Sequence, residues 1–216
     1  MKNRVGLLGG TFNPVHSGHV ELGLEIRRAF RLDRVLYILS ARPPHKLQVR
    51  VVPAPLRWKM LTIALKPYPE LVPCDIEMKR AGSSWTIRTI EELRKRFPED
   101  RFFFISGSEG FLNIKTWKDY RELLKFLSFI VVLRAEKDKE KVAALLKEEN
   151  LSPCFDIEEA LEMPEAPKIY IYSYRSDKLF ISSTLIRERR RTSTAVTGLV
   201  DQEVEKIMLE NKLYEG

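Results

Sequence analysis

Two of the three histidines, His16 and His19, stand three residues apart in the segment Gly9-Gly10-Thr11-Phe12-Asn13-Pro14-Val15-His16-Ser17-Gly18-His19. An apolar run ends at the two glycines, and a helical pattern begins at Gly18. At the start of a helix, this spacing lets both imidazoles point to one place. Glycines allow a ligand to approach the backbone, and a helix N-terminus offers N–H groups and a positive dipole end to a phosphate. The segment therefore predicts a phosphate-binding turn, although its glycine spacing differs from the GxGxxG of dinucleotide-binding proteins.

The third histidine, His45, lies in the loop Arg42-Pro43-Pro44-His45-Lys46, directly after the second expected strand. In an α/β sheet, ligands bind beyond the carboxyl ends of the strands, where the strand order reverses. All three histidines are therefore expected at this edge, which favours a ligand site over three structural histidines. The alternative for this loop is a proline-rich surface segment with a chance lysine.

Further along the chain, the segment Ile181-Ser182-Ser183-Thr184-Leu185-Ile186-Arg187 places three hydroxyls at the start of a helix and an arginine one turn later. Hydroxyls, helix N–H groups and a guanidinium together can form a phosphate clamp. Serine and threonine are also common helix N-caps, so a purely structural cap is the alternative.

These segments need elements to position them, and strand-like apolar runs alternate with helical spacing along the chain. Strands separated by helices predict a parallel sheet that is covered on both faces. We expect one doubly wound, mostly parallel Rossmann-like α/β domain over residues 1–216, with a helical C-terminal part over about residues 181–216. Ser84 is expected to cap the third helix. The expected strands are 4–8, 35–39, 71–76, 102–105, 129–133 and 168–172, and the expected helices are 18–30, 56–64, 84–97, 119–126, 137–149, 183–191 and 201–211.

The chain carries 37 basic and 30 acidic residues, and its net charge of +7 favours an anionic partner. Four arginines lie within residues 187–191, and five basic residues without an acid lie within residues 42–59. For these segments, phosphate binding is favoured over a solvated basic face. Charge alone does not separate nucleotides from nucleic acids or an anionic membrane surface.

Cys74 and Cys154 lie far apart without a CxxC partner, which argues against a zinc site or a disulfide framework. No apolar run approaches the ~18 residues of a membrane span. The apolar stretch near Met1 is too short for the core of a signal peptide. We therefore expect a cytoplasmic protein that binds no membrane.

The first turn, the Pro-Pro-His-Lys loop and the Ile-Ser-Ser-Thr-Leu-Ile-Arg segment resemble the nucleotidylyltransferase superfamily that carries the HxGH motif. In detail they are similar to the bacterial nicotinate-nucleotide adenylyltransferase family, and the resemblance runs from Val5 to Tyr214. Ser84-Trp85-Thr86 resembles the Ser-Tyr-Thr of that family, and Thr116-Trp117 with Tyr120 resembles its tryptophan-containing segment. Class I aminoacyl-tRNA synthetases carry a related HxGH signature, but three motifs in this order make the resemblance specific.

The resemblance implies adenylyl transfer from ATP to nicotinate mononucleotide, which gives deamido-NAD and pyrophosphate in NAD biosynthesis. It implies that His16 and His19 are catalytic and contact the ATP phosphates. It also implies that Trp117 stacks on the nicotinate ring and that Thr86 receives the nicotinate carboxylate. Mg²⁺ is expected as a cofactor bound through the ATP phosphates, without a metal site made of protein residues. The implied ATP-binding residues are Gly9, Gly10, Thr11, Phe12, Lys46, Gly107, Glu109, Ser183, Thr184 and Arg187.

Two positions depart from the pattern of the family. Gly107-Ser108-Glu109 stands where the family usually has Gly-x-Asp, with the aspartate near the adenylate ribose. A contact to the ribose would here come from a side chain that is one methylene longer. Asn13 stands where many relatives carry aspartate, although asparagine also occurs there.

Three other functions stay open at this point. Pantetheine-phosphate adenylyltransferase shares HxGH and Ser-Ser-Thr, but the Trp117 segment and the C-terminal helices count against it. NMN could replace nicotinate mononucleotide as the substrate, because the two differ only by an amide in NMN where nicotinate mononucleotide has a carboxylate. A non-enzymatic RNA-binding module would use the arginines up to Arg191, but no RRM, KH or OB signature supports it. The expected partners are ATP and nicotinate mononucleotide and no nucleic acid, and association into a homo-oligomer is left open.

Overall fold

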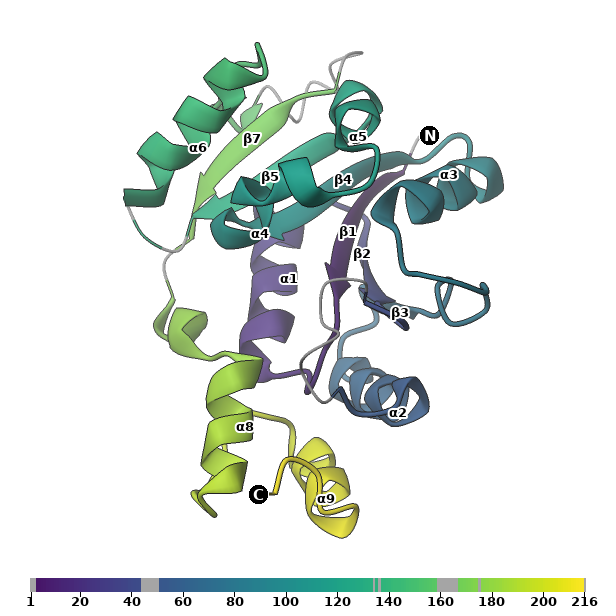
Figure 1. Cartoon of the computed structure of the whole chain (residues 1–216), viewed down its shortest axis with the longest axis vertical. Coiled ribbons are helices and arrows are strands. Elements are labelled where there is room, and N and C mark those ends of the chain that lie inside the picture. Colours follow the sequence, from purple (N-terminus) through teal and green to yellow (C-terminus); the bar gives the residue numbers. More distant parts are fainter. Residues whose placement is uncertain are drawn as a thin grey trace. The chain divides into compact units, whose positions relative to one another are not determined.

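The computed structural model describes residues 3–43, 51–133, 135, 137–158, 167–174 and 176–215. Figure 1 labels most of the strands and helices along the chain. The strands are β1 (Arg4–Gly10), β2 (Arg34–Leu39), β3 (Leu71–Cys74), β4 (Arg101–Gly107), β5 (Ser128–Leu133), β6 (Pro153–Cys154) and β7 (Ile169–Ser173). The helices are α1 (Ser17–Ala29), α2 (Ala54–Leu65), α3 (Thr86–Arg96), α4 (Ser108–Leu112), α5 (Tyr120–Phe126), α6 (Lys137–Glu148), α8 (Ser183–Arg191) and α9 (Gln202–Glu210), with the 3₁₀ turns η1 (Ile114–Thr116) and η2 (Asp177–Phe180).

In the described residues, seven strands form one sheet in the order β3-β2-β1-β4-β5-β7-β6. The pairs β1–β4, β4–β5, β5–β7 and β6–β7 are parallel. The strand order reverses at β1, which has β2 as one neighbour and β4 as the other. This is the doubly wound, Rossmann-like α/β fold that the sequence predicts. Each predicted strand and helix agrees with the observed one to within two residues at either end.

The chain groups into two compact units, which are described separately below. The first unit comprises Met1–Gly9, Ile26–Val35 and Trp85–Arg175. The second unit comprises Gly10–Glu25, Leu36–Ser84 and Ser176–Gly216. The single domain that we expect from the sequence stays a prediction.

Aromatic side chains fill the core of the first unit around β4, β5 and β7, which lie side by side in Figure 1. Phe104 of β4 stands opposite Phe129 of β5, and their ring centroids are 5.7 Å apart. Phe111 of α4 packs edge-to-face on Phe129 at 5.5 Å. Tyr170 of β7 packs edge-to-face on Phe30 at 5.7 Å. Edge-to-face pairs of this kind add stability beyond the apolar area that they bury.

The core of the second unit lies where α2 packs against α9 and β3. The side chain of Asp201 caps α9, because its Oδ1 atom accepts the backbone N–H of Glu203 at 2.9 Å. The N-cap supplies a partner to one of the amides that the first turn of a helix leaves without an intrahelical carbonyl. The buried apolar residues of the two helices are Met60, Leu61, Ala64 and Leu65 of α2 and Val204, Ile207 and Met208 of α9.

The predicted cap of α3 by Ser84 is wrong. Trp85 occupies the N-cap position, and its side chain makes no capping bond. The hydroxyl of Ser84 instead accepts the backbone N–H of Arg42 at 3.0 Å, and the N–H of Ser84 donates to the Arg42 carbonyl at 3.1 Å. Ser84 therefore closes a pairing with a residue far away in the sequence, which a local capping pattern cannot indicate. Helix α4 was absent from the prediction, since five residues are too few for a helical period.

The packing of α1 on Tyr37 gives the first prediction. A Cβ atom at Gly23 would overlap the hydroxyl of Tyr37, a fully buried side chain whose O–H donates to the carbonyl of His19 at 2.7 Å. Alanine favours a helix over glycine by up to about 1 kcal/mol. Overlap in a closely packed core costs about 1–3 kcal/mol. We therefore expect Gly23→Ala to lower the free energy of unfolding, as measured by urea denaturation.

The control is the double variant Gly23→Ala with Tyr37→Phe, which removes the nearest atom of the overlap. It should lose less stability than the sum of the two single variants. A Gly23→Ala protein as stable as the wild type would contradict close packing of α1 on Tyr37.

Candidate active site

The predicted histidine pair lies in the second unit at the start of α1, with ring centroids 3.6 Å apart. The backbone N–H of His16 donates to Nδ1 of His19 at 3.2 Å. Because Nδ1 accepts this bond, neutral His19 carries its proton on Nε2, which can donate to an anion. His16 is buried, and His19 is half-buried. The pair therefore presents an oriented N–H donor from an imidazole that packs on its neighbour.

Phe12 supports the pair from the core. Its ring is 2% exposed and meets the His19 ring edge-to-face at 5.1 Å. The backbone of Phe12 is left-handed (φ 46°), and this conformation turns the ring back toward Gly10. A Cβ atom at Gly10 would lie 2.9 Å from that ring, so glycine is required at this position. Phe12 can therefore offer a ligand its backbone, while its side chain belongs to the core.

The glycine of the motif, Gly18, makes room for His16. A Cβ atom at Gly18 would lie 3.1 Å from Nδ1 of His16 and 3.0 Å from the carbonyl oxygen of Lys178. A side chain here would push on the imidazole or on the backbone that faces it. The spacing His-x-Gly-His is thus a packing requirement as well as a chemical one.

Helix α8 is bonded to the turn that precedes the histidines. The hydroxyl of Ser183 donates to the carbonyl of Pro14 at 2.8 Å. The guanidinium of Arg187 donates to the carbonyl of Asn13 at 3.0 Å and to Oγ1 of Thr184 at 3.0 Å. Ser183, Thr184 and Arg187, predicted as a phosphate clamp, thus lie together beside the histidine turn.

The three hydroxyls of this segment have three different roles. Ser182 is the N-cap, and its Oγ accepts the N–H of Leu185 at 3.1 Å. Ser183 and Thr184 use their hydroxyls for the bonds to Pro14 and Arg187 described above. The backbone N–H groups of Ser183 and Thr184 belong to the first turn, which has no intrahelical acceptor for them. These amides are the part of the segment that best suits a phosphate.

A cavity of about 460 Å³ borders Thr184 and Arg187 within the second unit. Arg187, Arg191 and Lys212 bring three positive charges to its wall, against two negative charges from Glu188 and Glu215. The cavity has room for a polyphosphate chain, and its cationic side chains favour an anion.

Asn13 has a role that the sequence did not indicate. It is 3% exposed, and its Oδ1 atom accepts the hydroxyl of Tyr214 at 2.9 Å and the N–H of Val52 at 3.2 Å. Burial raises the pKa of Tyr214, so its hydroxyl stays a donor. An asparagine oxygen satisfies both donors without a buried charge. The side chain of Asn13 therefore fixes the turn rather than facing a ligand.

Arg57 corrects the interpretation of the basic segment 42–59. Its side chain is 1% exposed, so it belongs neither to a phosphate-binding surface nor to a solvated face. The guanidinium donates to the carbonyls of Val52, Thr11, Ser40 and Ala41, at 2.7, 2.6, 2.8 and 3.1 Å. Burial lowers the pKa of Arg57, and the nearby Tyr214 opposes this shift. Arg57 thus holds together the three chain segments that surround the histidine turn.

The remaining predicted residues lie in the first unit, apart from one. Gly9 and Gly107 stand at the carboxyl ends of the paired strands β1 and β4. Glu109 is exposed in the first turn of α4. Its neighbour Ser108 points inward, and its buried hydroxyl donates to Oδ2 of Asp138 at 2.6 Å. Lys46 and the nearby His45 lie outside the described residues.

Trp117 and Thr86 also belong to the first unit. The half-buried indole of Trp117 packs edge-to-face on Phe104, with centroids 5.5 Å apart and planes at 75°. Thr86 is the first residue of α3 and is half-buried. Its hydroxyl and the amides of the first turn suit a carboxylate.

In the described part of the chain, no helix combines the length and the apolar character of a membrane span. No three His, Cys, Asp or Glu side chains there lie close enough together to hold a metal ion. Cys74 and Cys154 are not joined by a disulfide bond.

The chain is similar to known proteins over nearly its whole length. A cytidylyltransferase-like family model matches residues 7–189. The chain is 36% identical over 214 residues to a probable nicotinate-nucleotide adenylyltransferase of Carboxydothermus hydrogenoformans, and the match covers 98% of each chain. It is 33% identical over 211 residues to a protein of the same description from Thermus thermophilus, with 98% and 99% covered.

A solved structure shares the fold at low sequence identity. It is described as Plasmodium falciparum nicotinic acid mononucleotide adenylyltransferase complexed with NaAD. The TM-score is 0.74 at 17% identity, and the match covers 98% of this chain and 97% of that one.

The buried guanidinium gives the second prediction. Arg57→Met would leave four backbone carbonyls without their donor. Loss of a buried charged partner costs about 3–5 kcal/mol. We expect a loss of this size in the free energy of urea unfolding, and a smaller one for Arg57→Lys, whose ammonium keeps the charge but cannot span the same carbonyls.

The matched control is Lys59→Met, because Lys59 is an exposed basic residue of the same helix. It should change stability by less than about 0.5 kcal/mol. Equal losses in Arg57→Met and Lys59→Met would refute the structural role of Arg57.

Proposed function

The chain belongs to the nicotinate-nucleotide adenylyltransferase family, and we propose that it transfers the adenylyl group of ATP to nicotinate mononucleotide. The products are deamido-NAD and pyrophosphate, and the reaction is a nucleotidyl transfer of NAD biosynthesis. The observation that carries the proposal is the histidine pair, whose turn is bonded to Ser183 and Arg187 of α8. We propose the cytoplasm as its compartment.

The chemistry needs positioned charge rather than a covalent intermediate. The 5′-phosphate of nicotinate mononucleotide attacks the α-phosphorus of ATP, and pyrophosphate leaves from the opposite side. Such a displacement is accelerated mainly by orientation of the reactants and by donors aimed at the developing charge. The second unit gathers donors of this type: imidazole N–H, helix amides and a guanidinium.

We assign the ATP phosphates to the second unit. Nε2 of His19 would donate to a phosphate oxygen, with His16 packed against its ring. The first turn of α8 and Arg187 would bind the β- and γ-phosphates. This geometry supports the roles that the resemblance implies for the residues concerned. The full proposed set for ATP is Gly9, Gly10, Thr11, Phe12, Lys46, Gly107, Glu109, Ser183, Thr184 and Arg187, with the exposed carboxylate of Glu109 toward the ribose.

We assign the nicotinate group to the first unit. The face of Trp117 would stack on the pyridine ring, since its indole is half-buried and already fixed by Phe104 at one side. The carboxylate would bind at the N-terminus of α3, where Thr86 offers a hydroxyl. A site that donates to a carboxylate leaves donors unpaired when the ligand carries an amide, which favours nicotinate mononucleotide over NMN.

The donors of the second unit also indicate how Mg²⁺ would be held. The N–H groups of His19, Arg187 and the first turn of α8 bind phosphate oxygens and have no lone pair to offer a hard cation. They fit an ATP that carries Mg²⁺ on its own phosphates. When bound, the ion would neutralise charge on the departing pyrophosphate.

The role of His19 gives the third prediction. His19→Ala should lower kcat by about 10²–10⁴, because one positioned donor to the transition state is lost. His19→Asn should lose as much, since its amide oxygen can still accept the N–H of His16 but no group replaces Nε2. His19→Gln, which places an amide N–H near the Nε2 position, should keep more activity. Steady-state kinetics with both substrates at saturation measure these effects.

Thermal unfolding of the three variants is the control, and their midpoints should stay near that of the wild type. Wild-type kcat in folded His19→Asn would contradict a donor role for Nε2.

The stacking role of Trp117 gives the fourth prediction. Trp117→Ala should raise the KM for nicotinate mononucleotide by about 5- to 150-fold, which corresponds to about 1–3 kcal/mol of lost stacking. The KM for ATP should change little. Trp117→Phe should fall in between, because a smaller ring can still pack on Phe104. Kinetics with each substrate varied in turn measure both constants.

Trp58→Phe on α2 is the matched control and should leave both constants unchanged. Equal increases of both KM values in Trp117→Ala would show that the indole only supports the fold. Preferential use of NMN by the wild type would contradict the assigned substrate.

A further inference from the structure

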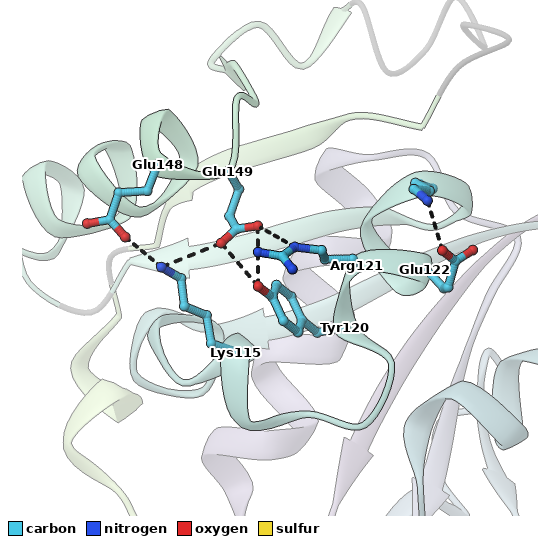
Figure 2. A network of polar contacts seen from close by, with 7 residues as sticks. Lys115, Tyr120, Arg121, Glu122, Glu148 and Glu149 are labelled. Atoms are coloured by element: carbon cyan, nitrogen blue, oxygen red, sulfur yellow. Dashed lines mark hydrogen bonds and ion pairs between the residues drawn. The ribbon is translucent and has the colours of Figure 1, made fainter.

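A cluster of charged and polar side chains joins the segment around Trp117 to the end of α6 (Figure 2). The carboxylate of Glu149 accepts the hydroxyl of Tyr120 at 3.2 Å and Nε of Arg121 at 3.4 Å. Nζ of Lys115 lies 2.6 Å from Oε2 of Glu148 and 3.5 Å from Oε1 of Glu149. We call these five residues the Glu149 cluster.

The cluster holds the chain on both sides of Trp117. Lys115 lies two residues before the indole, and Tyr120 lies three residues after it. Between them, the N–H of Trp117 donates to the carbonyl of Ile114 at 2.8 Å, and Asp119 takes a left-handed conformation (φ 53°). The edge-to-face contact with Phe104 holds the indole of Trp117 itself. The contacts of Lys115 and Tyr120 with Glu149 hold the chain on either side of it.

Glu149 is the central member of the cluster. Its side chain is 10% exposed, against 63% for Glu148, 44% for Lys115 and 72% for Arg121. A carboxylate at the C-terminal end of a helix is opposed by the helix dipole, so its burial there needs compensation. The hydroxyl of Tyr120 and the two cations provide it, and the guanidinium of Arg121 also lies over the Tyr120 ring at 5.2 Å.

The pKa values agree with this geometry. Burial raises the pKa of the Glu149 carboxyl, but the Tyr120 hydrogen bond together with Arg121 and Lys115 outweighs it and holds the pKa below its usual value. The hydrogen bond to Glu148 raises the pKa of Lys115. Both shifts favour the charged forms of Glu149 and Lys115.

We infer that Glu149 is a positioning residue for the pyridine nucleotide: it fixes the segment from Lys115 to Arg121 and thereby the stacking face of Trp117. The inference rests on the proposed function, since it takes Trp117 as the platform for the nicotinate ring. A platform that is fixed before binding spares the ligand the entropy of ordering it. Loss of the cluster should weaken binding of nicotinate mononucleotide and leave binding of the ATP phosphates unchanged.

The test is a set of variants with each substrate varied separately. Glu149→Ala should raise the KM for nicotinate mononucleotide by about 3- to 10-fold, with kcat and the KM for ATP changed by less than about 2-fold. Tyr120→Phe, which removes only one hydroxyl, should raise the same KM by about 2- to 5-fold. Glu149→Gln should recover part of the loss, because its amide oxygen still accepts the Tyr120 hydroxyl.

Glu122→Gln is the matched control. Glu122 lies on α5 in the same view (Figure 2) and pairs with Lys125 at 2.8 Å, and no dashed line there joins it to the cluster. It should leave all three kinetic constants unchanged.

A second readout does not depend on catalysis. In a protein that carries Trp58→Phe and Trp85→Phe, the remaining indole fluorescence comes from Trp117. Quenching by acrylamide should increase in Glu149→Ala and not in Glu122→Gln, because a released segment exposes the indole more.

The outcomes separate this inference from the proposed function. A wild type that does not convert nicotinate mononucleotide with ATP would refute the function itself. A wild type that does, together with an unchanged KM and unchanged quenching in Glu149→Ala, would overturn the role of Glu149 alone. A lower kcat together with higher KM values for both substrates and a lower thermal midpoint would also overturn it, since Glu149 would then only stabilise the fold.

Discussion

The second unit is organised around a buried cation that has carbonyl oxygens as its partners. The guanidinium of Arg57 donates to the carbonyls of Thr11, Ser40, Ala41 and Val52, which come from three separate chain segments. Carbonyls that converge in this way would repel one another without a donor between them, and only a planar fork of N–H groups reaches all of them. Thr11 leads directly into Phe12 and the histidine turn. The orientation of the imidazoles therefore depends on a residue that touches no substrate in the proposed mechanism.

The two parts of the proposed site are held by different forces. Close packing fixes the histidine pair, because the Phe12 ring packs against His19. The absence of a side chain at Gly10 leaves room for the Phe12 ring, and its absence at Gly18 leaves room for the His16 ring. Polar contacts of partly exposed groups fix the Trp117 segment, with the Glu149 carboxylate, which is 10% exposed, at their centre. Packing resists displacement in every direction, whereas hydrogen bonds and ion pairs can re-form after a small movement. The reacting phosphate needs groups that are fixed by close packing. For a ring that only stacks, a platform held by hydrogen bonds and ion pairs is sufficient.

The sequence predicted the fold and most elements correctly, because apolar periodicity records which face of each element is buried. Chain order in a doubly wound sheet also predicted that His16 and His19 lie at the edge where ligands bind. Only the resemblance linked Ser183, Thr184 and Arg187 to the same phosphates, and the structure bonds these residues to the histidine turn or to one another. The sequence pattern could not identify Arg57, whose charge is indistinguishable in a sequence from that of the exposed Lys59 two residues later. Nor could it separate the cap Ser182 from its neighbour Ser183, or find the pairing of Ser84 with Arg42. Such roles depend on contacts between distant segments, which no local pattern records.

Asn13 has a consequence for how the protein is made. Its side chain is bonded to Tyr214, 201 residues later, and its carbonyl to Arg187, 174 residues later. Ser17 of the same turn bonds Leu199 at a separation of 182 residues. Contacts of such long range form late in folding. While a ribosome synthesises the chain from N- to C-terminus, the histidine turn emerges long before the partners that hold it, which follow 174 to 201 residues later. A nascent chain therefore carries both imidazoles long before it can hold them in place, and adenylyl transfer begins only after α8 and the turn around Tyr214 have been synthesised and folded back.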